Sequence, residues 1–427
     1  MSKFQLILLS IFGAFIVIGV IAFSMARGGG AGATNVVIWG DIAGDAFNRT
    51  ITGFGGGDAN LPRIQYVYKP ADTFSADLTE AIATGNGPDL VIMNLSSIEK
   101  NKNKILVIPE SSLSQSDFKN TFIQEGELLS TTGGVYGLPL VVDPMVLYWN
   151  RDFFDKASLV APPQYWDEIY DYAVKLTEKD TAGNIQKSTI ALGETKNIPN
   201  SKNIMSLLLL QAGSPITLFQ YDRYHAVLTE RFNLPLQPAA AAIDFYTQFA
   251  NPTKRFYTWN SSLLPAQTTF TSGNSAMYLG FASELSILKA KNPTLNLAVA
   301  LVPQSRIADK KITFGKLEVV AVLKSSKNIP GAFSSLMSIV SKDNASALSN
   351  VIYIPPARRD LLSTPPKDYF LSMFYTAAIQ SRGWLDPDEK KTTGIFVDMI
   401  DGVTSGRAST QEAINTANVA IDSLINP

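Results

Sequence analysis

Short apolar runs separated by polar turns predict alternating strands and helices along the first part of the chain. Val36–Trp39, Ile64–Tyr68 and Asp89–Met93 are rich in Val, Ile and aromatic residues, which is typical of strands with a buried face. Phe74–Thr84 instead places its apolar residues at helical spacing, and Gly85 suits the end of that helix. This alternation favours an α/β fold.

The longest apolar stretch lies further along, in Gly134–Asn150. It contains two runs rich in Val and Leu, Leu138–Val142 and Met145–Trp149, separated by Asp143-Pro144. Proline cannot donate a ladder hydrogen bond, so we expect a kink or an edge between two buried strands at this point. Such a kink is a candidate crossing of the chain from one lobe to another, with a carboxylate at the crossing.

The N-terminal residues form the second long apolar segment. Residues 4–26 carry no formal charge over 23 positions, and as a helix they would be roughly 34 Å long, enough to cross a bilayer. We therefore expect a transmembrane anchor or signal segment in residues 1–27, followed by a flexible glycine-rich tether at residues 28–34. Ser24-Met25-Ala26 resembles a cleavage site for a signal peptide, so cleavage is the alternative to an uncleaved anchor.

Composition excludes several classes of protein. The 427 residues are 46% hydrophobic and carry a net charge of −1, so the chain lacks the basic footprint of a nucleic-acid-binding protein. It contains no cysteine, which excludes disulfides and thiolate sites, and a single histidine, which argues against a His-based metal site or a catalytic triad. We therefore expect no metal, no cofactor and no nucleic-acid partner.

Four segments, in matching order, resemble one known family. They are GLPLVVDPMVLYWNRDFFDKA around Asp143, IATGNGPDLVIM before Asn94, FTSGNSAMYLG before Phe281, and the closing helix after Gly406. These segments resemble the extracellular solute-binding proteins of ABC importers (family 1, maltose/sugar-binding-protein type). The resemblance implies a two-lobed periplasmic-binding-protein type II fold. Lobe 1 would comprise residues 35–142 plus 304–347, and lobe 2 residues 143–303 plus 348–427.

The same resemblance supplies the candidate ligand contacts. In the family, ligand-facing residues follow particular strands or lie at the crossing. The matching positions, together with one tryptophan in an expected loop, are Asp41, Met93, Asn94, Asp143, Phe281, Ser283 and Trp384. Carboxylates and amides bond to sugar hydroxyls, and an exposed aromatic plane, which we expect Trp384 to supply, packs on the apolar face of a pyranose ring. Structural alternatives are a helix cap or turn for Asp41 and a cap of the proline kink for Asp143.

The resemblance implies that the chain captures a small ligand, with a sugar or oligosaccharide as the leading expectation, by hinge closure. It would be a monomer on the outer face of the cytoplasmic membrane that delivers its ligand to an ABC transporter permease. Two alternatives stay open. One is a ligand-sensing partner of a membrane receptor. The other is an anchored carbohydrate-active enzyme that uses two carboxylates, for which Asp386, Asp388 and Glu389 supply acids close in sequence.

Overall fold

The computed structural model describes residues 35–55, 61–221, 223–306, 308 and 310–426. The chain divides into two compact units. Unit 1 comprises residues up to Val141, Leu317–Ile352 and Pro356–Leu361, and unit 2 comprises Val142–Lys316, Tyr353–Pro355 and the residues from Leu362 onward. The chain therefore passes between the units more than once, twice within a strand.

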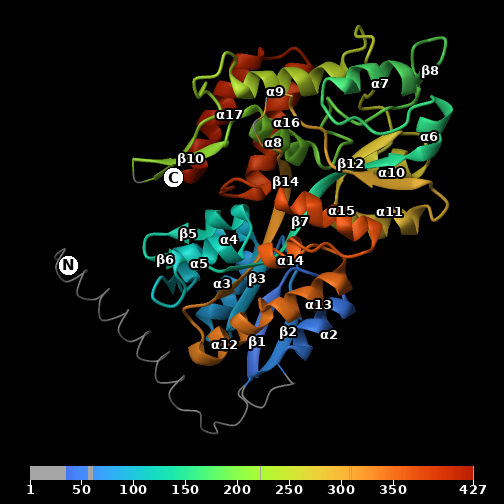
Figure 1. The fold of residues 1–427 in the computed structure, drawn as a ribbon. Helices are drawn as coiled ribbons and strands as arrows, with labels where there is room; N and C mark the ends of the chain where they lie inside the picture. The colour runs from blue at the N-terminus through green and yellow to red at the C-terminus, as the bar shows by residue number, and fades with distance from the viewer. Residues whose placement is uncertain (1–34, 56–60, 222, 307, 309, 427) are drawn as a thin grey trace. The chain divides into compact units, whose positions relative to one another are not determined.

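Unit 1 contains a sheet with helices packed on it (Figure 1). Its elements are β1 (Asn35–Gly40), α2 (Asp45–Gly53), β2 (Arg63–Tyr68), α3 (Phe74–Ala83), β3 (Leu90–Asn94), α4 (Leu95–Asn101), η1 (Lys102–Lys104), β4 (Ile108–Pro109), α5 (Gln115–Thr121), η2 (Gln124–Leu129), β5 (Ser130–Thr131), β6 (Gly134–Val135), α12 (Ile329–Ile339) and α13 (Lys342–Ile352). The strands β1, β2 and β3 and the helix α3 confirm the elements predicted from the apolar pattern.

The register of the sheet in unit 1 aligns the carboxyl ends of its parallel strands. β1 pairs in parallel with β2 on one side and with β3 on the other, with Gly40 opposite Tyr68 and Ile92. The second half of β14 (Thr313–Val322) runs antiparallel to β3 and places Glu318 opposite Asn94. α13, drawn in orange, packs against α2, drawn in blue, although the two are far apart in sequence (Figure 1). This arrangement brings the residues after β1 and β3 to one edge of the sheet.

Leu138–Asn150 is a single strand of 13 residues, β7, rather than the two strands expected from its proline. The predicted break at Asp143-Pro144 is therefore wrong. A proline costs a strand one N–H donor, but its restricted φ remains compatible with an extended backbone. The change from unit 1 to unit 2 falls inside this strand, between Val141 and Val142.

Unit 2 is built around the second half of β7 (Figure 1). Its other elements are α6 (Arg151–Lys156), α7 (Glu168–Leu176), β8 (Glu178–Lys179), β9 (Ile185–Lys187), α8 (Ser201–Ala212), β10 (Thr217–Gln220), β11 (Arg223–Ala226), α9 (Pro238–Thr247), η3 (Gln248–Ala250), α10 (Ala266–Thr271), β12 (Met277–Phe281), η4 (Ala282–Glu284), α11 (Leu285–Lys291), β13 (Leu297–Ala300), α15 (Tyr369–Ile379), β15 (Ser381–Arg382), α16 (Glu389–Thr404) and α17 (Thr410–Ile425), and a short helix α14 (Arg359–Leu362) joins the two units along the chain.

In unit 2, β7 pairs antiparallel with both β12 and β13, so Leu147 lies opposite Leu279 and Ala300. The antiparallel pairing with β12 runs to the pair Phe281–Met145. The end of β12 is therefore paired close to the point where β7 enters unit 2. Contacts link four helices of this unit, α8, α9, α16 and α17. The last of them, α17, begins at a capping box formed by Ser409 and Glu412.

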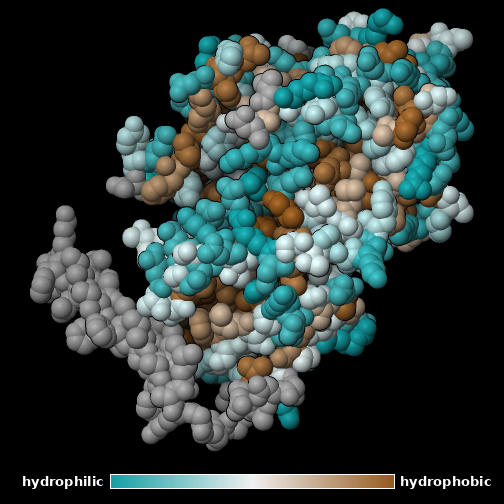
Figure 2. All heavy atoms as spheres, viewed as in Figure 1, coloured by the Kyte–Doolittle hydropathy of each residue, from teal (hydrophilic) through white to brown (hydrophobic). Residues whose placement is uncertain are grey.

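The predicted transmembrane segment at residues 4–26 and the tether at residues 28–34 lie outside the described residues. Among the helices that the structure describes, none combines the length and apolar character needed to span a bilayer. In the view of Figure 2, hydrophobic residues reach the surface in scattered places among hydrophilic ones. The described residues also contain no group of three or more His, Cys, Asp or Glu side chains that could hold a metal ion.

Candidate functional site

In unit 1, polar side chains gather at one edge of the sheet. Asp41 follows β1, Asn94 ends β3, and Glu318 lies directly opposite Asn94 on the antiparallel β14. All three are partly exposed to solvent. The carboxyl ends of strands in an open α/β sheet are where ligands commonly bind, so this edge is the candidate site of unit 1.

Tyr66 lies in the electric field of the two carboxylates of this edge. Burial raises the pKa of Tyr66, and the negative charges of Asp41 and Glu318 raise it further. Its hydroxyl donates a hydrogen bond of 2.8 Å to the carbonyl oxygen of Ile42 and thereby fixes the loop after β1. A Cβ at position 40 would lie 2.6 Å from this hydroxyl oxygen, which explains the glycine there. The tyrosine therefore holds the backbone beside Asp41 in place.

Asn94 has a structural role as well as its predicted one. Its Oδ1 accepts a hydrogen bond of 2.8 Å from the Ser97 N–H and caps α4. The neighbouring Met93 is fully buried within β3. The structure thus brings Asp41 and Asn94 to one edge, while Met93 belongs to the core of unit 1.

In unit 2, Asp143 and the residues after β12 come together. The backbone N–H of Ser283 donates a hydrogen bond of 3.0 Å to Oδ1 of Asp143. The Lys316 Nζ lies 4.2 Å from the ring centroid of Phe281, and Phe314 packs edge-on against the same ring. Ser283 is exposed, whereas Asp143 and Phe281 are 9% and 2% exposed. A carboxylate, a hydroxyl, an ammonium group and an aromatic ring therefore form one cluster.

The carboxyl group of Asp143 has an unusual pKa. Burial raises the pKa of Asp143 to about 6, although the hydrogen bonds from Ser283 and the charge of Lys316 oppose this effect. Glu284 adds a smaller effect that raises the pKa. An acid in this state loses its charge only slightly below neutral pH, where it stops being a charge-assisted acceptor.

Glu284 holds the loop that carries Phe281 and Ser283. Its carboxylate accepts hydrogen bonds from the Phe281 N–H at 2.9 Å, the Tyr278 hydroxyl at 2.5 Å and the Asn200 side chain at 3.0 Å. Gln267 donates a further hydrogen bond of 2.8 Å. Glu284 was not predicted as a site residue from the sequence. The sequence feature that could have identified it is an acidic residue three positions after the end of a buried strand, β12.

We expect Glu284→Ala to lower the free energy of unfolding by about 2–3 kcal/mol, because it removes the charged acceptor of four donors at once. Chemical denaturation measures the loss. Glu178→Ala is the matched control, since Glu178 is exposed and pairs with Lys187 at the surface, where an ion pair contributes about 0–1 kcal/mol. An equal loss in both variants would contradict the role assigned to Glu284.

Trp384 belongs to a different cluster of unit 2. It lies in the loop between β15 and α16, as expected, but it is only 4% exposed, so the expected exposure of its ring is wrong. The indole stacks on Phe396 with ring centroids 6.1 Å apart, and the Lys202 Nζ lies 5.7 Å from its centroid. Side chains from two helices, Phe396 of α16 and Lys202 of α8, lie against the ring.

The acids near Trp384 have structural partners. Asp386 forms an ion pair of 2.5 Å with Lys202, and burial raises the pKa of Asp386 against the opposing charge of that lysine. Asp388 caps α16 by accepting a hydrogen bond of 3.3 Å from the Lys391 N–H. These contacts explain the acidic sequence DPDE as a helix start anchored by a buried ion pair.

Two further charged residues were missed in the sequence. Lys316 and Glu318 are successive charges on β14, each partly buried, in a strand that is otherwise apolar. Period-two spacing places both on the same face of the strand. Charges that alternate with apolar residues at the start of a buried strand were the signal that could have identified them.

The chain matches a family model and several known proteins. The model described as bacterial extracellular solute-binding protein matches residues 38–336, more than half of the chain. A binding protein of Brucella abortus (strain 2308) is 31% identical over 108 residues, which are 25% of this chain and 26% of that protein. The chain therefore matches about a quarter of the length of this curated relative.

Solved structures are similar over nearly the whole length. A cyclic α-maltosyl-1,6-maltose binding protein from Arthrobacter globiformis superposes with a TM-score of 0.75 at 16% identity, covering 92% of this chain and 99% of the other. A cyclo/maltodextrin-binding protein complexed with maltotetraose superposes with a TM-score of 0.74 at 17% identity, covering 93% and 98%. These likenesses show a two-lobed mixed α/β fold of the solute-binding type and confirm that part of the expected fold class. The chain belongs to the bacterial extracellular solute-binding protein family.

Proposed function

We propose that the chain captures a sugar or oligosaccharide outside the cytoplasm and delivers it to the permease of an ABC transporter. The observation that carries this proposal is the cluster of unit 2, in which the buried Asp143 carboxylate, the exposed Ser283 and the Phe281 ring lie together. A carboxylate that accepts hydroxyl hydrogen bonds beside an exposed hydroxyl group suits a sugar. The sugar ligands named for the two similar solved structures agree with this choice.

Each unit would contribute its own set of contacts. In unit 1, Asp41 would accept hydrogen bonds from ligand hydroxyls at the sheet edge. Asn94 would donate hydrogen bonds to these hydroxyls or accept hydrogen bonds from them. In unit 2, Asp143 and Ser283 would do the same. Ligand contact by the buried Met93, Phe281 and Trp384 stays a prediction, and the low exposure of all three residues favours a supporting role.

Binding would proceed by closure of two lobes, residues 35–142 plus 304–347 and residues 143–303 plus 348–427. Contacts made from both lobes would stabilise the closed state relative to the open state. This mechanism requires no cofactor and no covalent step. We further propose that the protein is a monomer, held at the outer face of the cytoplasmic membrane by residues 4–26, as the long uncharged segment indicates.

Thermal melting of the full-length chain against a panel of maltodextrins, mannose oligosaccharides, monosaccharides, polyols and amino acids tests the proposal. We expect an upward shift with one or a few sugars. A ligand at a hundred times its dissociation constant adds about 2.7 kcal/mol to the stability of the native state. A shift with amino acids alone would replace sugar as the ligand class, and hydrolysis of a panel member would favour an enzyme.

A further inference from the structure

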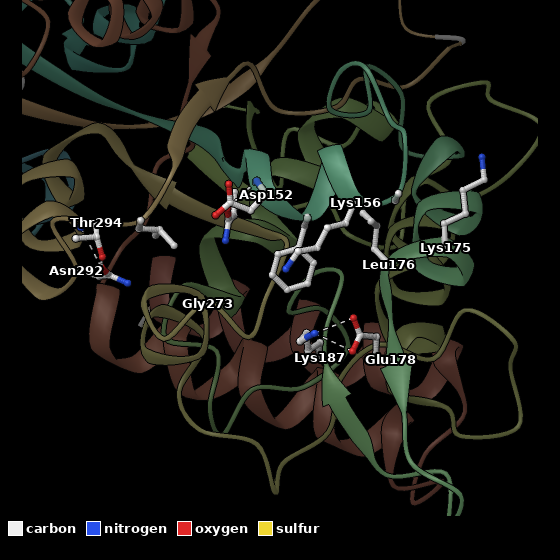
Figure 3. A pocket seen from close by; sticks show the side chains of 13 residues that line it. Asp152, Lys156, Lys175, Leu176, Glu178, Lys187, Gly273, Asn292 and Thr294 are labelled. Atoms are coloured by element: carbon white, nitrogen blue, oxygen red, sulfur yellow. Dashed lines mark hydrogen bonds and ion pairs between the residues drawn. The ribbon is translucent and has the colours of Figure 1, made fainter.

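A polar pocket that shares no residue with the cluster around Asp143 lies within unit 2. It has a volume of about 400 Å³ and is formed by α6, the end of α7, β8, β9 and the loops after α10 and α11 (Figure 3). This volume falls within the range of about 300–1,000 Å³ typical of small-molecule sites. Three of the residues that line it are lysines, Lys156, Lys175 and Lys187.

Two of these lysines are directed toward the same space. Figure 3 shows the side chains of Lys156 and Lys187 converging, whereas Lys175 points away. Lys187 forms an ion pair of 2.8 Å with Glu178, and its Nζ lies 5.9 Å from the Phe153 ring. Lys156 makes no ion pair with another of the described residues. The pocket therefore presents two ammonium groups, one of them partly neutralised by Glu178, and it is also lined by Asp152, whose carboxylate accepts a hydrogen bond from the Asn296 amide.

A buried amide adds a third donor. Asn150 lines the pocket and is only 4% exposed. Its Oδ1 accepts the Asp152 N–H at 3.0 Å and caps α6, which fixes the orientation of the amide. The amide nitrogen donates to none of the other described residues. The amide nitrogen keeps some exposure to solvent, so it can donate a hydrogen bond to an acceptor on a ligand bound in the pocket.

We propose that this pocket binds a small oxyanion, a phosphate group in class, borne on an organic molecule of about monosaccharide size. The anion would accept hydrogen bonds from the ammonium groups of Lys156 and Lys187 and from the Asn150 amide. Such charge-assisted hydrogen bonds are roughly twice as strong as neutral ones. The Phe153 ring, which lines the same pocket, offers an apolar wall to the organic part. This site is separate from the proposed sugar site and does not depend on it.

Calorimetric titration of the full-length chain with inorganic phosphate, glucose 6-phosphate and glucose, at constant ionic strength, tests the proposal. We expect saturable binding of phosphate that is weakened at least about tenfold in Lys156→Gln and in Lys187→Gln. Lys254→Gln, an exposed lysine of the same unit outside the pocket, should bind phosphate as the wild type does. If glucose binds Lys156→Gln and Lys187→Gln with the same affinity as the wild type, we assign that binding to the proposed sugar site.

A gain of affinity provides an independent control against misfolding. Glu178→Gln releases Lys187 from its ion pair and removes a negative charge, so phosphate should bind several-fold more tightly. Asn150→Asp keeps the cap of α6 but replaces the amide donor with a carboxylate, so binding should weaken. If glucose 6-phosphate binds more tightly than inorganic phosphate, the ligand is an organic phosphate. If the two bind with equal affinity, the pocket recognises the free anion. Absence of saturable phosphate binding, or equal effects in all three lysine variants, would overturn the proposal.

Discussion

Asp143→Asn should raise the free energy of unfolding above that of the wild type at neutral pH, and this gain should shrink at acid pH. The folded-state pKa of Asp143 is raised to about 6, so the buried carboxylate costs stability above that pH and costs nothing once it is protonated. The wild type should therefore lose about 3 kcal/mol of stability from this group as pH rises from about 4 to above 6. The asparagine keeps an acceptor for the Ser283 N–H and removes the charge. Denaturant unfolding at pH 4.5 and at pH 7.5 measures the difference.

The matched control is Asp171→Asn, which removes an exposed carboxylate from the same unit. Its stability should differ from that of the wild type by the same amount at both pH values. If Asp143→Asn behaves in the same way as this control, Asp143 is not a strained buried acid. The proposed function adds a second expectation, that Asp143→Asn weakens sugar binding by about tenfold or more through loss of a charge-assisted acceptor.

Trp384→Ala should lower the free energy of unfolding by about 3–5 kcal/mol, the usual cost of truncating a buried large aromatic residue. The indole is 4% exposed and stacks on Phe396, so its removal leaves a cavity under α16. It also removes the aromatic surface beside the Lys202 ammonium, which lies 5.7 Å from the ring centroid. Urea unfolding followed by circular dichroism measures the loss.

Trp384→Phe separates packing from ligand recognition. Because phenylalanine refills most of the cavity, this variant should recover more than half of the lost stability and bind sugar with unchanged affinity. A different pattern would contradict the packing role. If Trp384→Ala were as stable as the wild type but failed to bind sugar, the indole would be a ligand contact.

The early strands and helices of unit 1 could be predicted from the sequence because local pattern and packing agree there. β1, β2 and β3 are short runs rich in apolar residues, and α3 carries its buried residues Phe74 and Leu78 at helical spacing. The closing helix after Gly406 was likewise expected from the sequence, and it begins at the capping box of Ser409 and Glu412. In each case the decisive interactions lie within a few residues of one another.

The strand through Pro144 was not predicted correctly because the sequence rule describes only what proline forbids. Pro144 lacks a donor, yet β7 continues through it as an extended strand. The burial of Trp384 was missed for a related reason. Its loop position is local, but its covering residues, Phe396 and Lys202, come from two other helices.

The candidate site could be located but not completed from sequence. Family resemblance selected Asp143 and Ser283, which the structure joins by a hydrogen bond although they are 140 positions apart. It did not select Glu284 or Lys316, whose importance depends on tertiary neighbours such as Asn200 and Phe281. Long-range contacts of this kind leave only weak signals in a single sequence.

Calorimetric titration of the full-length chain with maltotetraose, and with whichever sugar gives the largest thermal shift, tests the central claim most directly. Our account predicts saturable binding of one sugar per chain at pH 7.5, weakened in Asp143→Asn and accompanied by no change in the sugar. Saturable binding restricted to a ligand without hydroxyl groups, or conversion of the sugar during the titration, would contradict the account.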